Sequence, residues 1–298
     1  MPGRITQNMM NTQLLTNLGS NLNRMNNLQN QMSTSRKINK PSDDPVGLSY
    51  SMRYRSELSN YDQYAKNADN AVSWLDYTDT MLGQAGSVLQ RIRELTVNAA
   101  NGTNPEDALK AVQSEVDQLS SQLVDIGNSQ FNGKYVFNGE LTDKIPYSTT
   151  NPEDSVTDSG EIKFQVGAGS QIPININGNA VFGSPNPGEN LFGVLKDLST
   201  ALSTGDQTSV SSLLGKLDSR LEQMLNVRSD LGAKTNRVEL AQDRLNDISI
   251  NLQSLQSKTE DADMAEVITN LKTQENVYES SLSVGSKLIQ HSLIDFLR

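Results

Sequence analysis

The sequence predicts a mainly α-helical fold. The N- and C-terminal regions are expected to form a long antiparallel helical bundle of coiled-coil type, with a small β domain inserted between them. Two observations predict this. Residues 1–35 and 262–298 carry apolar residues at steps of three and four, which is the spacing of one helical face. Residues 141–190 lose this spacing and fill with Gly, Pro, Asn and Thr. Two matching amphipathic ends favour pairing with each other, which would leave the middle as an insertion.

The first helix is expected within residues 1–35, and its other face is mostly Asn, Gln, Ser and Thr. A helix with so little charge and so many Asn residues is marginal on its own, so it needs a partner that covers its apolar stripe. That stripe contains Leu15, Leu18, Leu22, Met25, Leu28 and Met32.

Two further helices are expected before residue 130. Residues 42–45 read Ser-Asp-Asp-Pro, a capping side chain followed by Pro in the first turn, and Asn101-Gly102 is a good stop. Residues 104–107 read Asn-Pro-Glu-Asp and predict a new capped start with acids at the positive end of the helix dipole. The apolar stripe of this third helix is Leu109, Val112, Val116, Leu119, Leu123 and Ile126.

Short strands are expected next. Residues 135–137 lie between two Asn-Gly dipeptides, which are typical of hairpin turns. Two further strands are indicated by apolar residues that alternate with polar ones, and Pro173 predicts an edge position for the second of them. The alternating residues are Ile162, Phe164 and Val166 in one strand, and Ile172, Ile174 and Ile176 in the other.

Helix is expected again from about residue 190, with the most regular pattern of the chain. Apolar residues recur at steps of seven, which predicts packing along a long supercoiled neighbour. They are Val210, Leu217, Met224, Leu231, Val238, Leu245 and Leu252. Residues 261–263, Asp-Ala-Asp, then predict a break and a new helix cap.

These patterns predict three parts. Residues 1–35 with 262–298 would form a terminal helical pair for assembly, residues 36–140 with 190–261 a long helical bundle, and residues 141–189 a small β-rich outer insertion. The alternative for every stripe is an intramolecular core, and it is weakest for the two terminal stripes. The candidate assembly interface is Leu15, Leu18, Leu22, Met25, Leu28, Ile268, Leu271, Tyr278, Leu282, Ile289, Leu293 and Phe296.

Composition and motifs give no support to catalysis or to a cofactor. The net charge is −10, with 25 basic and 35 acidic residues, which disfavours binding to nucleic acid or to anionic membranes. No run of about 18 apolar residues predicts membrane insertion, and the polar start predicts no cleaved signal peptide. Cysteine is absent and His291 is the single histidine, so no metal site is expected. The acid pairs at residues 43–44 and at 261 and 263 are explained by helix capping.

Four segments in the same order resemble the bacterial flagellin superfamily. One is an Arg-Lys-Ile-Asn turn before an Asp-Asp-Pro-Val-Gly-Leu helix start, and another is a helix-ending Leu-Gln-Arg-Ile-Arg-Glu-Leu-Thr-Val-Asn-Ala-Ala block. The segments are residues 33–48, 89–103, 228–233 and 261–265. Prolines at 41 and 45, the Phe-Asn-Gly-Lys-Tyr-Val-Phe-Asn-Gly run at 131–139 and the ending at 292–297 are more similar to the hook-associated branch of the superfamily than to filament subunits.

The resemblance implies a non-enzymatic, extracellular structural protein of the flagellum, located at the junction between hook and filament and exported without a cleaved signal peptide. The implied partners are the first hook-associated protein, flagellin, further copies of the chain in a ring, an export chaperone and the flagellar type III export apparatus. The alternatives are a filament flagellin and, in another class, a coiled-coil adhesin or secretion chaperone. The heptads fit the coiled-coil alternative, but the β insertion and the four segments do not.

Overall fold

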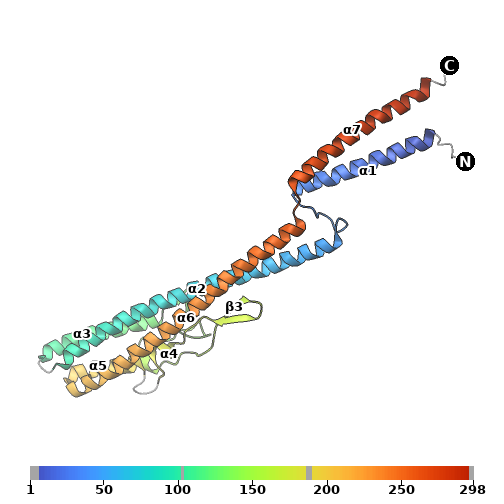
Figure 1. Cartoon of the computed structure of the whole chain (residues 1–298). Helices are drawn as coiled ribbons and strands as arrows, with labels where there is room; N and C mark the ends of the chain where they lie inside the picture. Colours follow the sequence, from blue (N-terminus) through green and yellow to red (C-terminus); the bar gives the residue numbers. More distant parts are fainter. Residues whose placement is uncertain (1–6, 102–103, 186–189, 295–298) are drawn as a thin grey trace. The chain divides into compact units, whose positions relative to one another are not determined.

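A computed structural model of the chain describes residues 7–101, 104–185 and 190–294 (Figure 1). The chain divides into two compact units, one made of residues 1–60 with 249–298 and the other of residues 61–248. Long helices dominate both units, and the described residues contain two small two-stranded antiparallel sheets. The predicted fold class, a helical bundle with a small β-containing part, is therefore confirmed.

The elements follow one another in a simple order. The helices are α1 (Gln7–Thr34), α2 (Pro45–Ala100), α3 (Glu106–Gly127), α4 (Gly178–Phe182), α5 (Leu191–Thr204), α6 (Gln207–Glu260) and α7 (Met264–Ile294). The strands are β1 (Gln130–Phe131), β2 (Lys134–Tyr135), β3 (Lys163–Gly167) and β4 (Ser170–Pro173), and η1 (Pro152–Asp154) is one turn of 3₁₀ helix.

Helix ends follow the local signals with one exception. The Asp44 carboxylate accepts hydrogen bonds from the amides of Val46 and Gly47 at 3.1 and 2.9 Å, so α2 begins with the predicted cap and Pro45. At the start of α3 the predicted side-chain cap is wrong. Pro105 occupies the cap position without a side-chain hydrogen bond, because the Asn104 amide instead donates to the Asn98 carbonyl at 2.7 Å.

The heptad positions of α6 form the seam along which it packs. All seven predicted residues, from Val210 to Leu252, are buried, which confirms that this stripe is intramolecular. Arginine pairs reinforce the packing in the second unit. Arg228 of α6 binds Asp79 of α2 through two hydrogen bonds of 2.7 and 2.9 Å, which hold the pKa of Asp79 below its ordinary value. Arg91 of α2 likewise binds Glu115 of α3 at 2.8 Å.

The helical region that begins near residue 190 is two helices rather than one. Gly205 adopts a left-handed conformation with φ of 70° and ends α5, and the Asp206 carboxylate then caps α6 by accepting from the amides of Thr208 and Ser209. The sequence contains this Gly-Asp signal, but the continuous apolar pattern hides it.

The strands are shorter than predicted. The Asn132-Gly133 turn does join a hairpin, β1 with β2, but the strand expected at residues 135–137 ends at Tyr135. The Val136 amide donates to Ser129 and the Phe137 carbonyl accepts from Gly178, so this backbone is satisfied outside any sheet. β3 pairs with β4 as expected, whereas Ile174 and Ile176 are buried beyond the end of β4.

A cluster of aromatic rings joins the insertion to the helices. Phe137, Tyr147, Phe182 and Phe192 are buried and contact one another with ring centroids 5.0–5.7 Å apart. Burial raises the pKa of the Tyr147 phenol well above its ordinary value. These rings belong to the same hydrophobic core as the buried residues of α2, α3 and α6. The insertion therefore contributes to the core of the second unit.

The α6 seam generates the first prediction. Leu245→Ala should lower the free energy of unfolding by about 2–5 kcal/mol, because the side chain is 4% exposed and its loss leaves a cavity. The matched control Leu225→Ala, where the leucine is 57% exposed, should change it by no more than about 0.5 kcal/mol. Urea unfolding followed by circular dichroism measures both. Equal losses would contradict an intramolecular seam.

Candidate assembly site

The candidate site is the pair of terminal helices in the first unit. Figure 1 shows α1 and α7 side by side, with the N-terminal end of α1 next to the C-terminal end of α7. Val267 and Leu271 of α7 are buried in the seam between the helices, and Leu14 of α1 is half-buried. At Gly285 a Cβ atom would lie 2.7 Å from Cδ2 of Leu14. The pair is therefore close-packed at this point, where α7 has no side chain.

The predicted interface residues divide between two faces of this pair. Leu271 is buried in the seam, and Leu18, Met25, Leu28 and Tyr278 are half-buried. The exposed members are Leu15, Leu22, Ile268 and Leu282. Ile289, Leu293 and Phe296 lie outside the side chains that the structure describes.

The exposed face contains more apolar residues than the sequence analysis named. Among the described residues of the predicted interface, the most exposed is Leu15, whose exposed fraction is 69%. The additional exposed residues are Met9, Met10, Met32, Val277 and Val284. Met32 belongs to the predicted stripe of the first helix but was not included in the candidate interface, and the other four residues fall outside the three-four spacing of the predicted stripes. Large apolar side chains left in solvent at this many positions of one helical pair favour covering by another protein, because that removes apolar surface from water.

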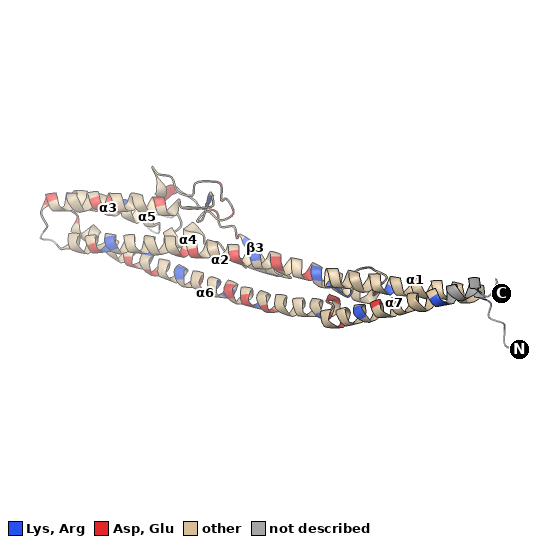
Figure 2. Cartoon of the chain, turned by 90° about the horizontal axis from the view of Figure 1, so that it is seen from above, with Lys and Arg blue, Asp and Glu red and all other residues tan. Residues whose placement is uncertain are grey.

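The polar face of α1 is also suited to burial. Arg24 is the one charged residue of this helix, and Figure 2 shows α1 almost without charge colours. Hydroxyl groups donate back to the preceding turn of their own helix, from Thr12 to the Asn8 carbonyl at 2.8 Å and from Thr16 to the Thr12 carbonyl at 2.9 Å. Because these hydroxyls are already satisfied, covering them with protein leaves no unpaired donor.

An open groove of about 480 Å³ follows the boundary between the two helices. Leu14, Val277 and Val284 supply its apolar part, and Asn17, Asn276 and the serines of α7 supply its polar part.

The base of the pair is closed by a short backbone clip. The Lys37 amide donates to the Glu260 carbonyl at 2.7 Å, and the Ala262 amide donates to the Ser35 carbonyl at 3.1 Å. Arg36 and Asp261 thus form an isolated antiparallel bridge. The clip joins the segment that leaves α1 to the segment that enters α7.

A buried carboxylate lies beneath this clip. The Glu260 side chain is 2% exposed, and its oxygens accept from Ser51 Oγ at 2.7 Å, from the guanidinium of Arg55 and from Gln256 Nε2 at 3.2 Å. Arg36 Nε lies 2.9 Å from the same carboxylate. Sequence reasoning missed this residue, because Ser51 and Arg55 are 209 and 205 positions away and give no local signal.

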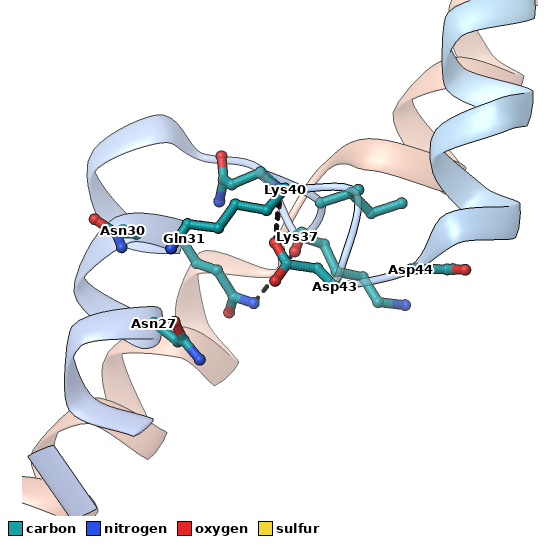
Figure 3. Close-up of a pocket in the computed structure, with 9 residues that line it drawn as sticks. Asn27, Asn30, Gln31, Lys37, Lys40, Asp43 and Asp44 are labelled. Carbon is teal, nitrogen blue, oxygen red and sulfur yellow. Dashed lines mark hydrogen bonds between the residues drawn. The ribbon is translucent and has the colours of Figure 1, made fainter. Parts of the chain in front are cut away.

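Figure 3 shows the polar pocket beside the clip, of about 370 Å³. Gln31 Nε2 donates to the Lys37 carbonyl at 3.3 Å, and the Asp43 carboxylate accepts from the amides of Asn39 and Lys40 at 3.1 and 2.8 Å. Asp43 therefore holds the turn between α1 and α2 and caps no helix, so the capping interpretation is correct for Asp44 but not for Asp43.

The remaining acidic residues have structural roles as well. Asp263 caps α7 through the Ala265 amide at 2.9 Å, and Asp261 accepts from Ser257 Oγ at 2.6 Å. Within residues 7–101, 104–185 and 190–294, no cluster of three or more His, Asp or Glu side chains is arranged to hold a metal ion. No helix in this described part is long and apolar enough to cross a membrane.

Comparison with known protein families identifies both ends of the chain. Residues 5–142 match the bacterial flagellin N-terminal helical region, and residues 214–297 match the bacterial flagellin C-terminal helical region. The chain is 30% identical over 283 residues to the flagellar filament 30.7 kDa core protein of Treponema maltophilum, with 94% of each chain covered.

Hook-associated proteins are similar to the chain as well. It is 26% identical over 273 residues to the flagellar hook-associated protein 3 of Escherichia coli, covering 84% of this chain and 86% of that protein. Among solved structures, FlgL of Bacillus cereus is 26% identical with a TM-score of 0.59, and the match covers 69% of this chain and 99% of that one.

The clip generates the second prediction. Glu260→Ala removes the acceptor for two guanidinium groups and a hydroxyl, and should destabilise the base of the helical pair by on the order of 2 kcal/mol after allowance for the half-exposed arginines. The Lys37 amide should then exchange roughly 30-fold faster by NMR hydrogen exchange. The control Glu275→Ala removes an exposed pair with Lys272 and should change this rate less than about threefold. Unchanged exchange in Glu260→Ala would exclude a stabilising role for the carboxylate.

Proposed function

The chain belongs to the bacterial flagellin family, and we propose that within this family it forms the junction ring between the hook and the flagellin filament. On the hook side its partner would be the first hook-associated protein, on the other side flagellin, and within the ring further copies of itself. Members of this family are structural proteins of the flagellum, so the chain is a flagellar component and we propose no catalytic activity for it.

The observation that carries the proposal is the exposed apolar face of the terminal helix pair. Leu15, Ile268, Leu282 and Val284 face solvent in the single chain, and the hydroxyls beside them are satisfied within their own helices. Covering such a face with neighbouring helices is favourable by about 25 cal/mol for each Å² of apolar surface removed from water. Residues 1–35 with 262–298 would thus be the assembly part, residues 36–140 with 190–261 the supporting bundle, and residues 141–189 the outer insertion.

Similarity to hook-associated proteins supports the junction role over a filament role. FlgL of Bacillus cereus and the hook-associated protein 3 of Escherichia coli are both covered over most of their length. Residues 40–45 and 131–139 resemble the same branch of the family. The second candidate function is a filament flagellin, favoured by the 30% identity to the Treponema filament core protein. A coiled-coil adhesin or secretion chaperone finds no support in the comparisons.

The route to this position is part of the same proposal. The protein would be delivered by a flagellar export chaperone to the type III export apparatus and leave the cell without a cleaved signal peptide. The marginal stability of α1 on its own fits such a route, because a helix of this composition is easily kept unfolded until a partner covers it.

A deletion strain tests the choice between the two functions. Loss of the gene should leave hooks that carry no filament while flagellin is shed into the medium, and expression of the intact chain should restore filaments. Electron microscopy of the cells and quantification of the chain in purified flagella measure this, and a junction protein should be a minor component. A chain that makes up most of the filament mass would instead identify it as flagellin.

The exposed apolar face generates a further prediction. Leu15→Asp should leave monomer melting almost unchanged, because the side chain is already in solvent, but should abolish filament attachment, because an unpaired carboxylate would be buried in the assembly at a cost of several kcal/mol. Leu15→Met keeps the apolar surface and should retain attachment. Leu271→Asp lies in the seam and should loosen the helical pair of the monomer itself. Normal attachment with Leu15→Asp would contradict the assembly role of this face.

A further inference from the structure

The second unit carries a groove that the proposed junction role does not explain. It has a volume of about 410 Å³ and is bordered by Tyr61 of α2, by the β3–β4 turn and by Arg237, Leu240 and Arg244 of α6. The hairpin is fixed against α2, because Asn67 Nδ2 donates to the Gln165 carbonyl at 2.9 Å. The wall of the groove is therefore part of the fold rather than a loose loop.

The groove combines an exposed leucine with two arginines that have no partner. Leu240 is 70% exposed. Within the described part of the chain, neither Arg237 nor Arg244 makes an ion pair or a hydrogen bond, although Arg91 and Arg228 of the same unit each bind a carboxylate on another helix. In a chain of net charge −10, two unpaired arginines on either side of an apolar residue are a surface that selects an acidic partner.

The chain itself supplies an acidic surface of matching dimensions. Asp117 and Asp125 of α3 are exposed and make no ion pair or side-chain hydrogen bond within the described residues. They are eight residues apart, or about 12 Å along the helix, and Arg237 and Arg244 are seven residues apart, or about 10 Å. Each pair lies within about 80° around its helix, so both members can face one neighbour.

The residues between the charges are complementary in size as well. Leu240 projects from the basic side, and the exposed Ser121 lies midway between the two aspartates. A small residue opposite a large apolar one allows two helices to approach closely enough for both charge pairs to form.

We propose that the groove of Arg237, Leu240 and Arg244 docks a second copy of this chain through Asp117 and Asp125 on α3 of that copy. The inference rests on the proposed function only in that the protein must assemble with copies of itself. The inference specifies which surfaces of two neighbouring copies are in contact, and these surfaces belong to the second unit rather than to the terminal helices.

Charge reversal tests the contact. Arg237→Asp with Arg244→Asp should reduce the number of cells with attached filaments at least tenfold, and Asp117→Arg with Asp125→Arg should do the same. Combining all four substitutions in one chain should restore attachment, because each copy then presents the reversed pair to its neighbour. The purified variants should melt like the wild-type chain, since all four side chains are exposed. As a matched control, Lys144→Asp with Lys216→Asp makes the same change of charge elsewhere and should leave attachment normal.

Cysteine cross-linking provides a readout that does not depend on charge. The natural chain has no cysteine, so Leu240→Cys with Ser121→Cys introduces one thiol on each face. Mild oxidation of isolated flagella should produce disulfide-linked multimers, and each single variant should produce none by this contact.

The outcomes separate the possibilities. Normal attachment in the double arginine variant, or absence of cross-linked multimers, would overturn the proposal. Loss of attachment that the four-fold variant does not restore would assign the arginines to a different acidic protein and would equally overturn docking of a second copy. The deletion strain described above uses only the wild-type chain, so a failure of the junction role is recognised independently.

Discussion

The seven-residue repeat of α6 is the constraint on which most of the structure depends. A helix of 54 residues that buries an apolar side chain at every seventh position must have another helix beside it, because a single stripe cannot be covered by short elements. In the second unit α2 meets this need, and the ion pairs Arg228–Asp79 and Arg93–Asp218 form on the outside of the contact between α2 and α6. Such exposed pairs contribute only about 0–1 kcal/mol each, so they select the alignment while the buried repeat provides the stability.

The terminal pair follows a different design. The half-buried positions of α1 are Asn11, Leu14, Leu18, Asn21, Met25, Leu28 and Gln31. Asn11 and Asn21 share the three-four spacing of the apolar positions, and polar residues in such a stripe fix the register of two helices at the expense of their stability. The pair therefore has a defined alignment but a weak seam, while large apolar residues remain on its outer face. A weak seam between the two helices and exposed apolar residues on their outer surface are expected of a segment that becomes stable only when neighbouring proteins cover it.

Sequence reasoning succeeded where the determining interactions are local. The cap by Asp44, the cap by Asp263 and the hairpin at Asn132-Gly133 depend on residues within a few positions, and the α6 repeat depends on one helix. Sequence reasoning failed where the structure depends on contacts between segments that are distant in the sequence. The strand at 135–137 ends early because Phe137 is bonded to Gly178, and Glu260 could not be recognised because its partners lie more than 200 positions away. The sequence revealed the terminal stripes. It could not reveal which of their residues lie between the two helices, because that depends on how each helix is rotated about its axis.

The part of the chain outside the two matched family regions is a further place where a junction protein and a filament protein can differ. The matched regions, 5–142 and 214–297, contain both terminal helices, the clip at Glu260 and most of the long bundle. Residues 143–213 lie outside them and contain β3, β4, α4 and α5. Their interior side, with Phe182 and Phe192, is fixed by the shared core, so it is free to vary only in ways that preserve packing. Their solvent side has no such constraint. Additional specificity for a neighbour is therefore expected on that solvent side, whereas the proposed assembly surface lies in the shared terminal pair.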